Sequence, residues 1–201
     1  MSLIPESLQT LVAEISKLPG VGEKTAMRYA VSLLKGGHKR IEDLGRALAH
    51  MHMQLDTCPK CHFWTQEGDC GLCEDNDRDM QKLCIVRDAP DVMALEKQRK
   101  QPWQYHVLQG LLSPMGGIGP DKIRLQSLFD RVKSDTVTEI IIALDATLEG
   151  DATAFFIRDH LAKDFAHVDI SRTALGIPAG SSVEYLDPST LEHALNHRVR
   201  F

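Results

Sequence analysis

The chain has 201 residues, of which 43% are hydrophobic and 25% charged, and its net charge is −5. Such a composition excludes a globally disordered chain, and no apolar stretch is long enough to cross a membrane. The acidic balance excludes a uniformly basic nucleic-acid-binding protein, so we expect a cytoplasmic protein with one medium-sized domain and smaller appendages.

The first predicted region, residues 1–55, is helical. Apolar residues recur at steps of three and four over 8–18, which indicates one face of a helix. Proline and two glycines in 19–22 then enforce a tight turn. A second helical pattern covers 26–34, and a third covers 41–51. A helix, a glycine-containing turn and a second helix predict a helix-hairpin-helix.

The hairpin has the residue types that bind phosphate. Gly20 and Gly22 let the backbone approach an anion closely, and the amides at the next helix start face it. Lys24 and Arg28 are four residues apart and so emerge on one side of that helix. Residues 17–40 contain six basic residues and one acid, an excess of five positive charges. We expect DNA binding by phosphate contact; the alternative is an ordinary helical hairpin with a solvated basic face.

Two Cys-x-x-Cys pairs follow in the second region, residues 56–75. They consist of Cys58 with Cys61 and of Cys70 with Cys73. Two such turns can complete a tetrahedral four-thiolate zinc site. This short segment cannot bury a core of its own, and a structural metal, worth about 10–16 kcal/mol, is enough to order it. Two disulfides are the disfavoured alternative, because the chain opens without a signal peptide and Cys84 has no partner. His62 is predicted to be a bystander.

The third region, residues 80–175, alternates between strand and helix patterns. Strands are expected at 83–86, 106–108, 140–144 and 168–170. Helices are expected at 92–100, 125–132 and 152–161. This alternation predicts a mostly parallel sheet with helices on both faces. Near the end of the chain, Ser189 and Glu192 resemble a capping box that opens a last helix.

An acidic segment follows the strand expected at 140–144. Asp145, Glu149 and Asp151 lie where ligands of parallel sheets usually bind, beyond the carboxyl ends of the strands. Three carboxylates on one turn could hold a divalent cation such as Mg²⁺. They could equally cap the following helix, because acids favour helix N-termini. Both interpretations stay open.

In this order, the features resemble the bacterial recombination mediator RecR family. The resemblance rests on the glycine hairpin, the four cysteines, the alternating region with Glu149-Gly150, and motifs at 112–114, 117–120, 172 and 176–180. It covers essentially the whole chain. It implies an α+β and α/β multi-module fold: a helix-hairpin-helix (1–55), a four-cysteine zinc finger (56–75), a Toprim-like α/β domain (80–175) and a C-terminal strand/helix segment for subunit contact (176–201).

The resemblance implies a DNA-repair accessory protein that is not an enzyme. Members of the family form rings around DNA and act with RecO and RecF to help RecA replace single-strand-binding protein on gapped or single-stranded DNA. Their DNA-contacting hairpin positions match Lys24 and Arg28, and their ligands for structural zinc match the four cysteines. Their Toprim region contacts partners, chiefly RecO. The segment 172–201 resembles the part that joins subunits.

The chain departs from the Toprim and RecR patterns at three positions of the Toprim-like region, and Met115-Gly116 and Ala174-Leu175 also differ from the commoner RecR sequence. Arg87 stands where Toprim enzymes place a glutamate, Thr147 replaces their second aspartate, and Asp145 replaces the usual RecR asparagine. Losing a carboxylate and gaining a cation weakens a two-metal site. We expect Arg87 to pair with Asp145 or another carboxylate. The alternative functions are a Toprim-type phosphoryl-transfer enzyme (nuclease, primase or topoisomerase), which needs a full acidic centre, and a monomeric DNA-binding adaptor.

Overall fold

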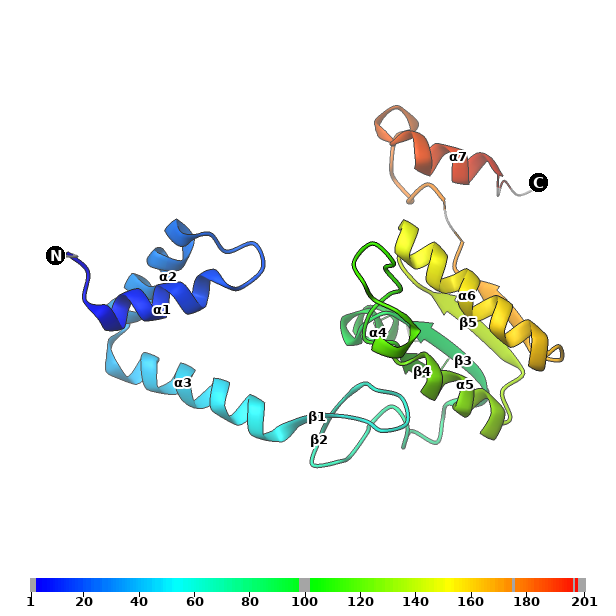
Figure 1. Ribbon diagram of the computed structural model, residues 1–201, viewed down its shortest axis with the longest axis horizontal. Coiled ribbons are helices and arrows are strands. Elements are labelled where there is room, and N and C mark those ends of the chain that lie inside the picture. The colour runs from blue at the N-terminus through cyan, green and yellow to red at the C-terminus, as the bar shows by residue number, and fades with distance from the viewer. Residues whose placement is uncertain (1–2, 98–101, 175, 197, 199–201) are drawn as a thin grey trace. The chain divides into compact units, whose positions relative to one another are not determined.

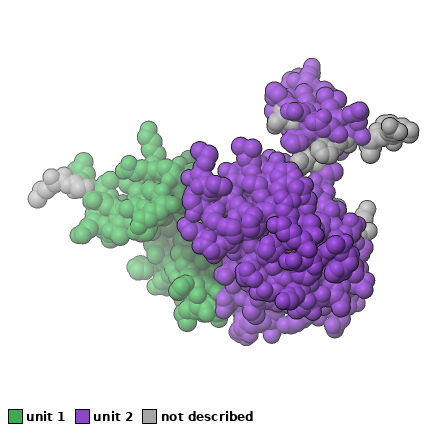
Figure 2. All heavy atoms as spheres, turned by 45° about the vertical axis from the view of Figure 1, so that its right-hand side comes forward, with its two compact units in different colours: residues 1–55 green, residues 56–201 purple. Residues whose placement is uncertain are grey.

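The computed structural model describes residues 3–97, 102–174, 176–196 and 198 (Figure 1). The chain divides into two compact units, residues 1–55 and residues 56–201 (Figure 2). Within the described residues, every helix is too short or too polar to cross a membrane.

Unit 1 is helical throughout, as the sequence predicts. Its helices are α1 (Glu6–Ser16), α2 (Glu23–Lys35) and α3 (Gly37–Gln54). A small core holds α1 against α2, formed by Val12 from α1 and by Ala26 and Ala30 from α2. The two alanines have no bulk beyond Cβ, so the helices approach closely across the turn that separates them. The predicted helix-hairpin-helix is confirmed.

Helix α3 packs differently from the other two helices. None of its 18 residues, all of which are described, is buried. Apolar side chains recur along it at alternating steps of three and four, and each is more than 40% exposed: Ile41, Leu44, Leu48, Met51 and the following Leu55. This spacing places them in one stripe along the helix, which we call the α3 stripe.

Unit 2 is built on a four-stranded parallel sheet in the order β4-β3-β5-β6. The strands are β3 (Asp79–Val86), β4 (Trp103–Val107), β5 (Glu139–Ala143) and β6 (Asp169–Arg172). In register, Ile85 on β3 lies between His106 on β4 and Ile142 on β5. The predicted parallel sheet is confirmed.

Helices cover both faces of this sheet, because successive strand residues point to opposite sides. Leu83 and Ile85 face the larger core, which α5 (Leu125–Ser134) and α6 (Leu148–Asp164) complete. Cys84 and Val86 face a smaller core beneath α4 (Ala89–Glu96). The predicted helix at 92–100 thus ends early, and residues 98–101 lie outside the described residues.

The segment after the sheet contains a 3-10 turn, η2 (Val183–Tyr185), and α7 (Pro188–Asn196), rather than the expected strand, in its described residues. The predicted cap of this helix is wrong by two residues. Asp187, not Ser189, precedes the helix, and its carboxylate accepts hydrogen bonds from the Thr190 amide (3.0 Å) and hydroxyl (2.6 Å). Proline is well suited to the first helical position because its fixed φ matches the helix, so the helix starts at Pro188.

Candidate metal centre and nucleic-acid interface

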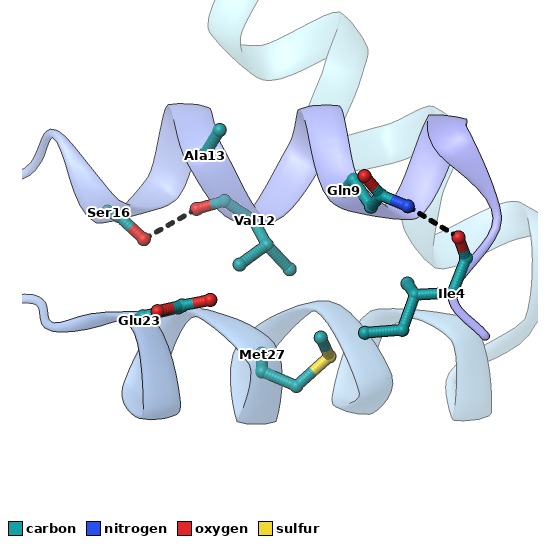
Figure 3. A pocket seen from close by; sticks show the side chains of 7 residues that line it. All are labelled: Ile4, Gln9, Val12, Ala13, Ser16, Glu23 and Met27. Atoms are coloured by element: carbon teal, nitrogen blue, oxygen red, sulfur yellow. Dashed lines mark hydrogen bonds between the residues drawn. The ribbon is translucent and has the colours of Figure 1, made fainter. Parts of the chain in front are cut away.

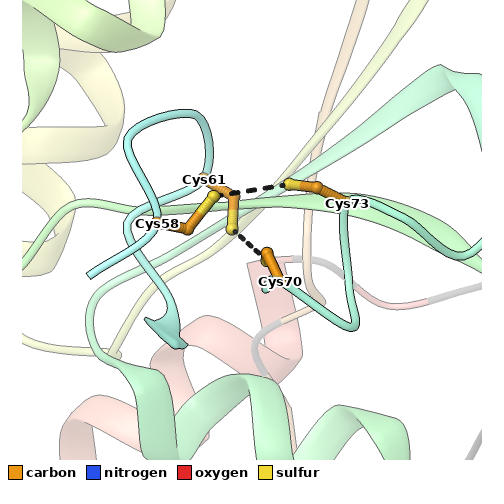
Figure 4. A group of neighbouring side chains, drawn as sticks. All are labelled: Cys58, Cys61, Cys70 and Cys73. Carbon is orange, nitrogen blue, oxygen red and sulfur yellow. Dashed lines mark hydrogen bonds between the residues drawn. The ribbon is translucent and has the colours of Figure 1, made fainter. Parts of the chain in front are cut away.

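The four cysteines of the two Cys-x-x-Cys pairs converge on one point (Figure 4). Their sulfur atoms all lie within 4.8 Å of one another. Two close contacts join one member of each pair, with sulfur–sulfur distances of 3.5 Å from Cys61 to Cys70 and 3.8 Å from Cys58 to Cys73. A disulfide bond is about 2.05 Å long, and all four thiols are free. The predicted gathering of the cysteines is confirmed.

Backbone hydrogen bonds shape each Cys-x-x-Cys turn. The His62 amide donates to the Cys58 carbonyl (2.9 Å), and the Cys58 amide donates to the Phe63 carbonyl (2.8 Å). In the second turn, the amides of Cys73 and Glu74 both donate to the Cys70 carbonyl (3.0 Å each). The left-handed backbone of His62 (φ 60°) closes the first turn. Each turn therefore directs two sulfurs to the same side.

The thiols are electrostatically coupled. A hydrogen bond with Cys61 lowers the pKa of Cys73 to about 5, and the same interaction together with burial raises the pKa of Cys61. Several buried thiolates cannot coexist without a compensating cation. A soft tetrahedral four-sulfur set provides the ligands that zinc and related metals prefer. The site therefore fits a metal ion.

Three contacts attach this cysteine module to the sheet and α5. The Cys61 carbonyl accepts from the Val107 amide (2.8 Å), His62 Nε2 lies 2.8 Å from Ser127 Oγ, and Lys60 lies 3.2 Å from Asp135. Burial opposes ionisation of Asp135, but its hydrogen bonds to Lys60 and Arg131 outweigh this and lower its pKa. His62 lies outside the four-cysteine cluster, is buried and fixes the module to α5.

Two buried arginines escaped sequence reasoning. Arg131 donates to the Tyr105 carbonyl (2.6 Å) and the Gln104 amide oxygen (2.9 Å). Arg78 makes a two-armed contact with Glu96, at 3.0 and 2.8 Å. Charged residues are rarely buried unless paired, and these acceptors are 18 to 27 residues away in sequence. The local signal is limited to one acid for each arginine, Asp75 three residues before Arg78 (3.3 Å) and Asp135 four residues after Arg131 (3.2 Å), and it does not identify the distant acceptors.

In the hairpin of unit 1, Gly20 adopts a left-handed φ of 76°, which only glycine reaches without strain. Gly22 precedes α2 and has no side chain to cap it, so the first amides of α2 are open to an anion. Lys24, Arg28 and Lys35 line a shallow groove along one face of α2. Sequence reasoning did not single out Lys35, although its position seven residues after Arg28 indicated the same face.

The cations of this groove are available to a ligand. Among the described residues, neither Lys24 nor Arg28 takes part in an ion pair, and Arg28 lies only over the Tyr29 ring (5.9 Å). By contrast, nearby Lys17 is already paired with Glu14 at 2.7 Å. The structure thus places the predicted pair of cations beside the open helix start.

A second pocket in unit 1, between α1 and α2, lacks a cluster of charged or catalytic side chains that could bind or react with a ligand (Figure 3). Val12 and Met27 contribute apolar surface, and Glu23 is its single carboxylate. The Ser16 hydroxyl donates to the Val12 carbonyl (2.7 Å). We assign it no ligand.

At the carboxyl edge of the sheet, the acidic segment is neutralised by arginines. Arg87 pairs with Asp145 and, at 2.8 Å, with Asp88, which confirms the predicted Arg87–Asp145 contact. Arg172 pairs with Asp151 at 2.6 Å. Burial opposes the charge on Arg87, but the carboxylates outweigh it and raise the pKa of Arg87.

The acidic segment forms neither a metal-binding group nor a side-chain cap of α6. Thr147 caps α6, because its hydroxyl accepts from the Gly150 amide at 3.1 Å. Asp145, Glu149 and Asp151 do not converge as a metal-ligating group; within the described residues, the cysteines alone form such a group. Glu149 and Asp151 lie in the first turn of α6, where their negative charges interact favourably with the positive end of the helix dipole, although neither side chain caps the helix.

The fold and site together define a class: a multi-module protein that joins a helix-hairpin-helix, a four-cysteine cluster able to hold a metal ion and an α/β domain with a parallel sheet. Family models match as follows: "RecR, helix-hairpin-helix" at residues 8–52, "Toprim domain" at 81–174 and "RecR, C-terminal" at 176–199.

Full-length relatives agree with these matches. Three similar proteins, each called "Recombination protein RecR", come from Cytophaga hutchinsonii, Staphylococcus aureus and Desulfatibacillum aliphaticivorans. They are 43%, 40% and 38% identical to this chain, covering 100%, 97% and 98% of it and 98% of each relative. The chain belongs to the RecR family of recombination proteins.

Proposed function

We propose that this protein is a ring-forming DNA-binding mediator, acting in the cytoplasm with RecO and RecF to promote RecA loading on gapped or single-stranded DNA. The observation that carries the proposal is the pair Lys24 and Arg28 beside the uncapped start of α2, with no ion-pair partner among the described residues. Family membership supports the choice of recombination partners.

In this mechanism the hairpin binds DNA phosphates. The open amides of α2 and the two cations contact the backbone, so binding is independent of sequence and weakens steeply with salt. One subunit of net charge −5 binds weakly. A ring presents several hairpins to one DNA molecule, which raises the overall affinity without a new contact.

Exposed apolar surface supports self-association. The α3 stripe has the three-four spacing of helices that pair with other helices. In the C-terminal segment, Val183, Tyr185 and Leu195 are each more than half exposed. We propose that both surfaces meet other subunits, since large exposed apolar patches usually mark interaction sites.

We propose zinc as the metal of the cysteine module, held by Cys58, Cys61, Cys70 and Cys73. When bound, zinc supplies structural cross-linking, because four thiolates leave no open coordination position for a substrate. The carboxylates at the sheet edge are proposed to contact a partner, chiefly RecO, rather than Mg²⁺, since Arg87 and Arg172 already compensate two of them.

The DNA-binding proposal is tested with Lys24→Ala/Arg28→Ala, compared with Lys17→Ala as a matched control. Lys17 is on the same unit but is already paired with Glu14. Binding of labelled DNA is measured at low salt by fluorescence anisotropy. We expect the double variant to bind about 10–100-fold more weakly, as loss of two charge-assisted contacts implies, while Lys17→Ala binds normally. Unchanged affinity in the double variant would refute the assigned surface.

The mediator role is tested on gapped DNA coated with single-strand-binding protein. RecA filament formation is followed with and without this protein and RecO, beside a mass measurement of the assembly. Acceleration that requires both proteins supports the proposal. A particle that keeps the mass of one chain at micromolar concentration would favour the monomeric adaptor instead.

The rival function is a Toprim-type phosphoryl-transfer enzyme. Such an enzyme requires an acidic centre that binds metal cations, whereas here the Arg87 guanidinium already pairs with the Asp145 carboxylate. Purified protein is incubated with labelled DNA and Mg²⁺. We expect no cleavage, and cleavage that disappears in Asp145→Ala would establish the enzyme.

A further inference from the structure

A pocket in unit 2 lies between the cysteine module and the ends of β3 and β4, and we call it the module pocket. Its volume is about 270 Å³. Its lining comes from three segments and includes His62 and Trp64 of the cysteine module, Arg87 and Asp88 after β3, and Val107 and Gln109 at the end of β4. The acidic segment at 145–151 contributes none of the lining residues.

Trp64 gives this pocket an aromatic wall that is open to solvent. The indole is 44% exposed, although Thr65, the next residue in β2 (Trp64–Gln66), is buried. The Phe63 ring lies 6.0 Å from the indole and packs against both the smaller core of the sheet and the cysteines. Because the indole sits on this ordered support, it can stack on a flat ligand with little further loss of entropy.

The backbone is strained at two positions of the module pocket. In the part of the chain that the structure describes, three non-glycine residues adopt a left-handed φ, and two of them line this pocket: His62 (60°) and Gln109 (58°). Such conformations are energetically costly and are concentrated at sites that bind ligands. The Gln109 amide donates to the Arg87 carbonyl (2.8 Å), which holds the strained residue at the mouth of the pocket.

The side-chain amide of Gln109 has a fixed orientation and an available donor. Its Oε1 accepts a hydrogen bond from Arg124 Nε (2.9 Å), which identifies the oxygen end of the amide. Its Nε2 lies 3.4 Å from the His62 carbonyl, a long contact that uses one of the two N–H groups. Among the described residues, the second N–H has no partner, so it is available to a ligand.

The charges of the module pocket favour a neutral ligand. Arg87 and Asp88 pair with each other at 2.8 Å, and Arg87 also pairs with Asp145. A phosphate gains little from a guanidinium that two carboxylates already share, and Asp88 repels it. A purely apolar side chain would cover these polar groups without replacing their hydrogen bonds to water. A flat, neutral ligand with an apolar face and a polar edge suits both the indole and the polar groups.

We propose that the module pocket binds an unstacked nucleobase of single-stranded DNA: the base stacks on Trp64, and its polar edge accepts a hydrogen bond from Gln109 Nε2. This inference rests on the proposed function, because it adds a base contact to the phosphate contacts of the hairpin. The bases of a duplex are stacked and paired, so they enter such a pocket only after they are extruded. The pocket therefore gives the protein a preference for single-stranded DNA, whatever its sequence, since every base has a face that can stack.

The main experiment uses the full-length protein with its metal and three labelled DNA probes of equal length: an oligothymidine, an abasic strand and a duplex. Binding is measured for the unaltered protein, Trp64→Ala, Trp64→Phe and the control Phe155→Ala, which removes an aromatic side chain of similar exposure (51%) on α6. We expect Trp64→Ala to weaken oligothymidine binding about 5–50-fold, Trp64→Phe much less, and Phe155→Ala not at all. Duplex affinity and the dependence on salt should not change, because the phosphate contacts remain.

Two further measurements do not depend on how well Trp64→Ala folds. The unaltered protein should bind oligothymidine about 5–50-fold more tightly than the abasic strand, which has the same phosphates. The chain has two tryptophans, so Trp103→Phe leaves Trp64 as the single fluorescent indole. Oligothymidine should quench its fluorescence, and the abasic strand should not. Gln109→Ala should weaken oligothymidine binding about 2–10-fold, as loss of one hydrogen bond implies.

The outcomes separate this inference from the proposed function. Normal oligothymidine affinity in Trp64→Ala overturns the base pocket and leaves the hairpin site standing. An equal loss for oligothymidine and duplex also overturns it, because the indole then supports the fold or a backbone contact. If Trp64→Ala binds every DNA probe normally but loses RecO, the pocket takes a protein side chain and the inference is wrong. If the unaltered protein binds none of the probes, the proposed function fails together with the pocket.

Discussion

Two groups of basic side chains in this protein differ in whether an acidic side chain compensates their charge. In unit 1, Lys24 and Arg28 stand beside an open helix start with no carboxylate partner among the described residues. At the carboxyl edge of the sheet in unit 2, Arg87 and Arg172 are each bound to an aspartate. A cation that is already compensated gains little from a phosphate. The first group is therefore suited to DNA, and the second stabilises its own domain.

The contrast explains how a chain of net charge −5 can bind an anion. Net charge sums over the molecule, whereas a screened interaction samples charges within about 10 Å at moderate salt. The acids of unit 2 neutralise their own arginines and lie outside the hairpin sequence. What decides binding is which cations have no internal partner.

The strongest test of the comparison removes the metal. The cysteine module carries Lys60 and His62, which hold it to α5, and a structural metal contributes about 10–16 kcal/mol in similar small modules. We expect a strong chelator under reducing conditions to abolish amide-exchange protection over residues 56–75 while the helices of unit 1 keep theirs. Cys84→Ala, which changes a buried cysteine outside the cluster, serves as the control and should keep its metal. Protection that survives complete metal removal contradicts the assignment.

A salt titration sharpens the comparison. Each phosphate contact to duplex DNA contributes about 0.9 to the slope of log affinity against log salt. Removing Lys24 and Arg28 should lower that slope by about 1.8 for each bound hairpin. Arg87→Ala should leave it unchanged, because that guanidinium is committed to Asp88 and Asp145. Equal losses of slope in both variants would mean that the paired arginines also reach DNA.

Acid should destabilise unit 2 through His106. Burial lowers the pKa of this fully buried imidazole from 6.5 to about 3, so between those values the unfolded chain binds the extra proton. The contribution of His106 to stability is then complete above pH 6.5 and falls as the pH is lowered, by about 3 kcal/mol at pH 4.5. Urea unfolding at pH 4.5, compared with unfolding above pH 6.5, measures this loss of stability. In His106→Leu the dependence on pH should be flatter; an identical dependence assigns the acid sensitivity elsewhere.

The smallest expected effect is on stability at the paired arginines. Arg87→Ala removes two contacts of a side chain that is 37% exposed, and such exposed pairs are worth about 0–1 kcal/mol each. We expect Arg87→Ala to unfold at a temperature a few degrees lower than the unaltered protein. The unfolding temperature of Arg87→Lys should lie between those of the unaltered protein and Arg87→Ala. A much larger loss would show that the pair supports the sheet edge in a way that the ion-pair geometry does not explain.

Local patterns were sufficient for the elements and for contacts between strand ends. Apolar spacing gave the helices of unit 1, and alternation gave the parallel sheet. The Arg87–Asp145 pair followed because β3 and β5 are neighbours whose carboxyl ends meet. The caps were harder, because one turn can offer several acceptors: Thr147 and Asp187 cap α6 and α7, respectively, and neither was chosen.

The amino-acid sequence by itself determined the four-cysteine module and the hairpin with its two cations, because each depends on residues close together in the chain. It also determined membership of the RecR family, because the motifs follow one another in order along the whole chain. Only the tertiary structure decided how the other buried or paired charges are compensated. Arg131 is buried by β4 residues more than 25 positions away, and Arg172 reaches Asp151 from the next strand. Whether a charged side chain faces water, a partner or its own fold depends on distances that the linear order of residues does not contain.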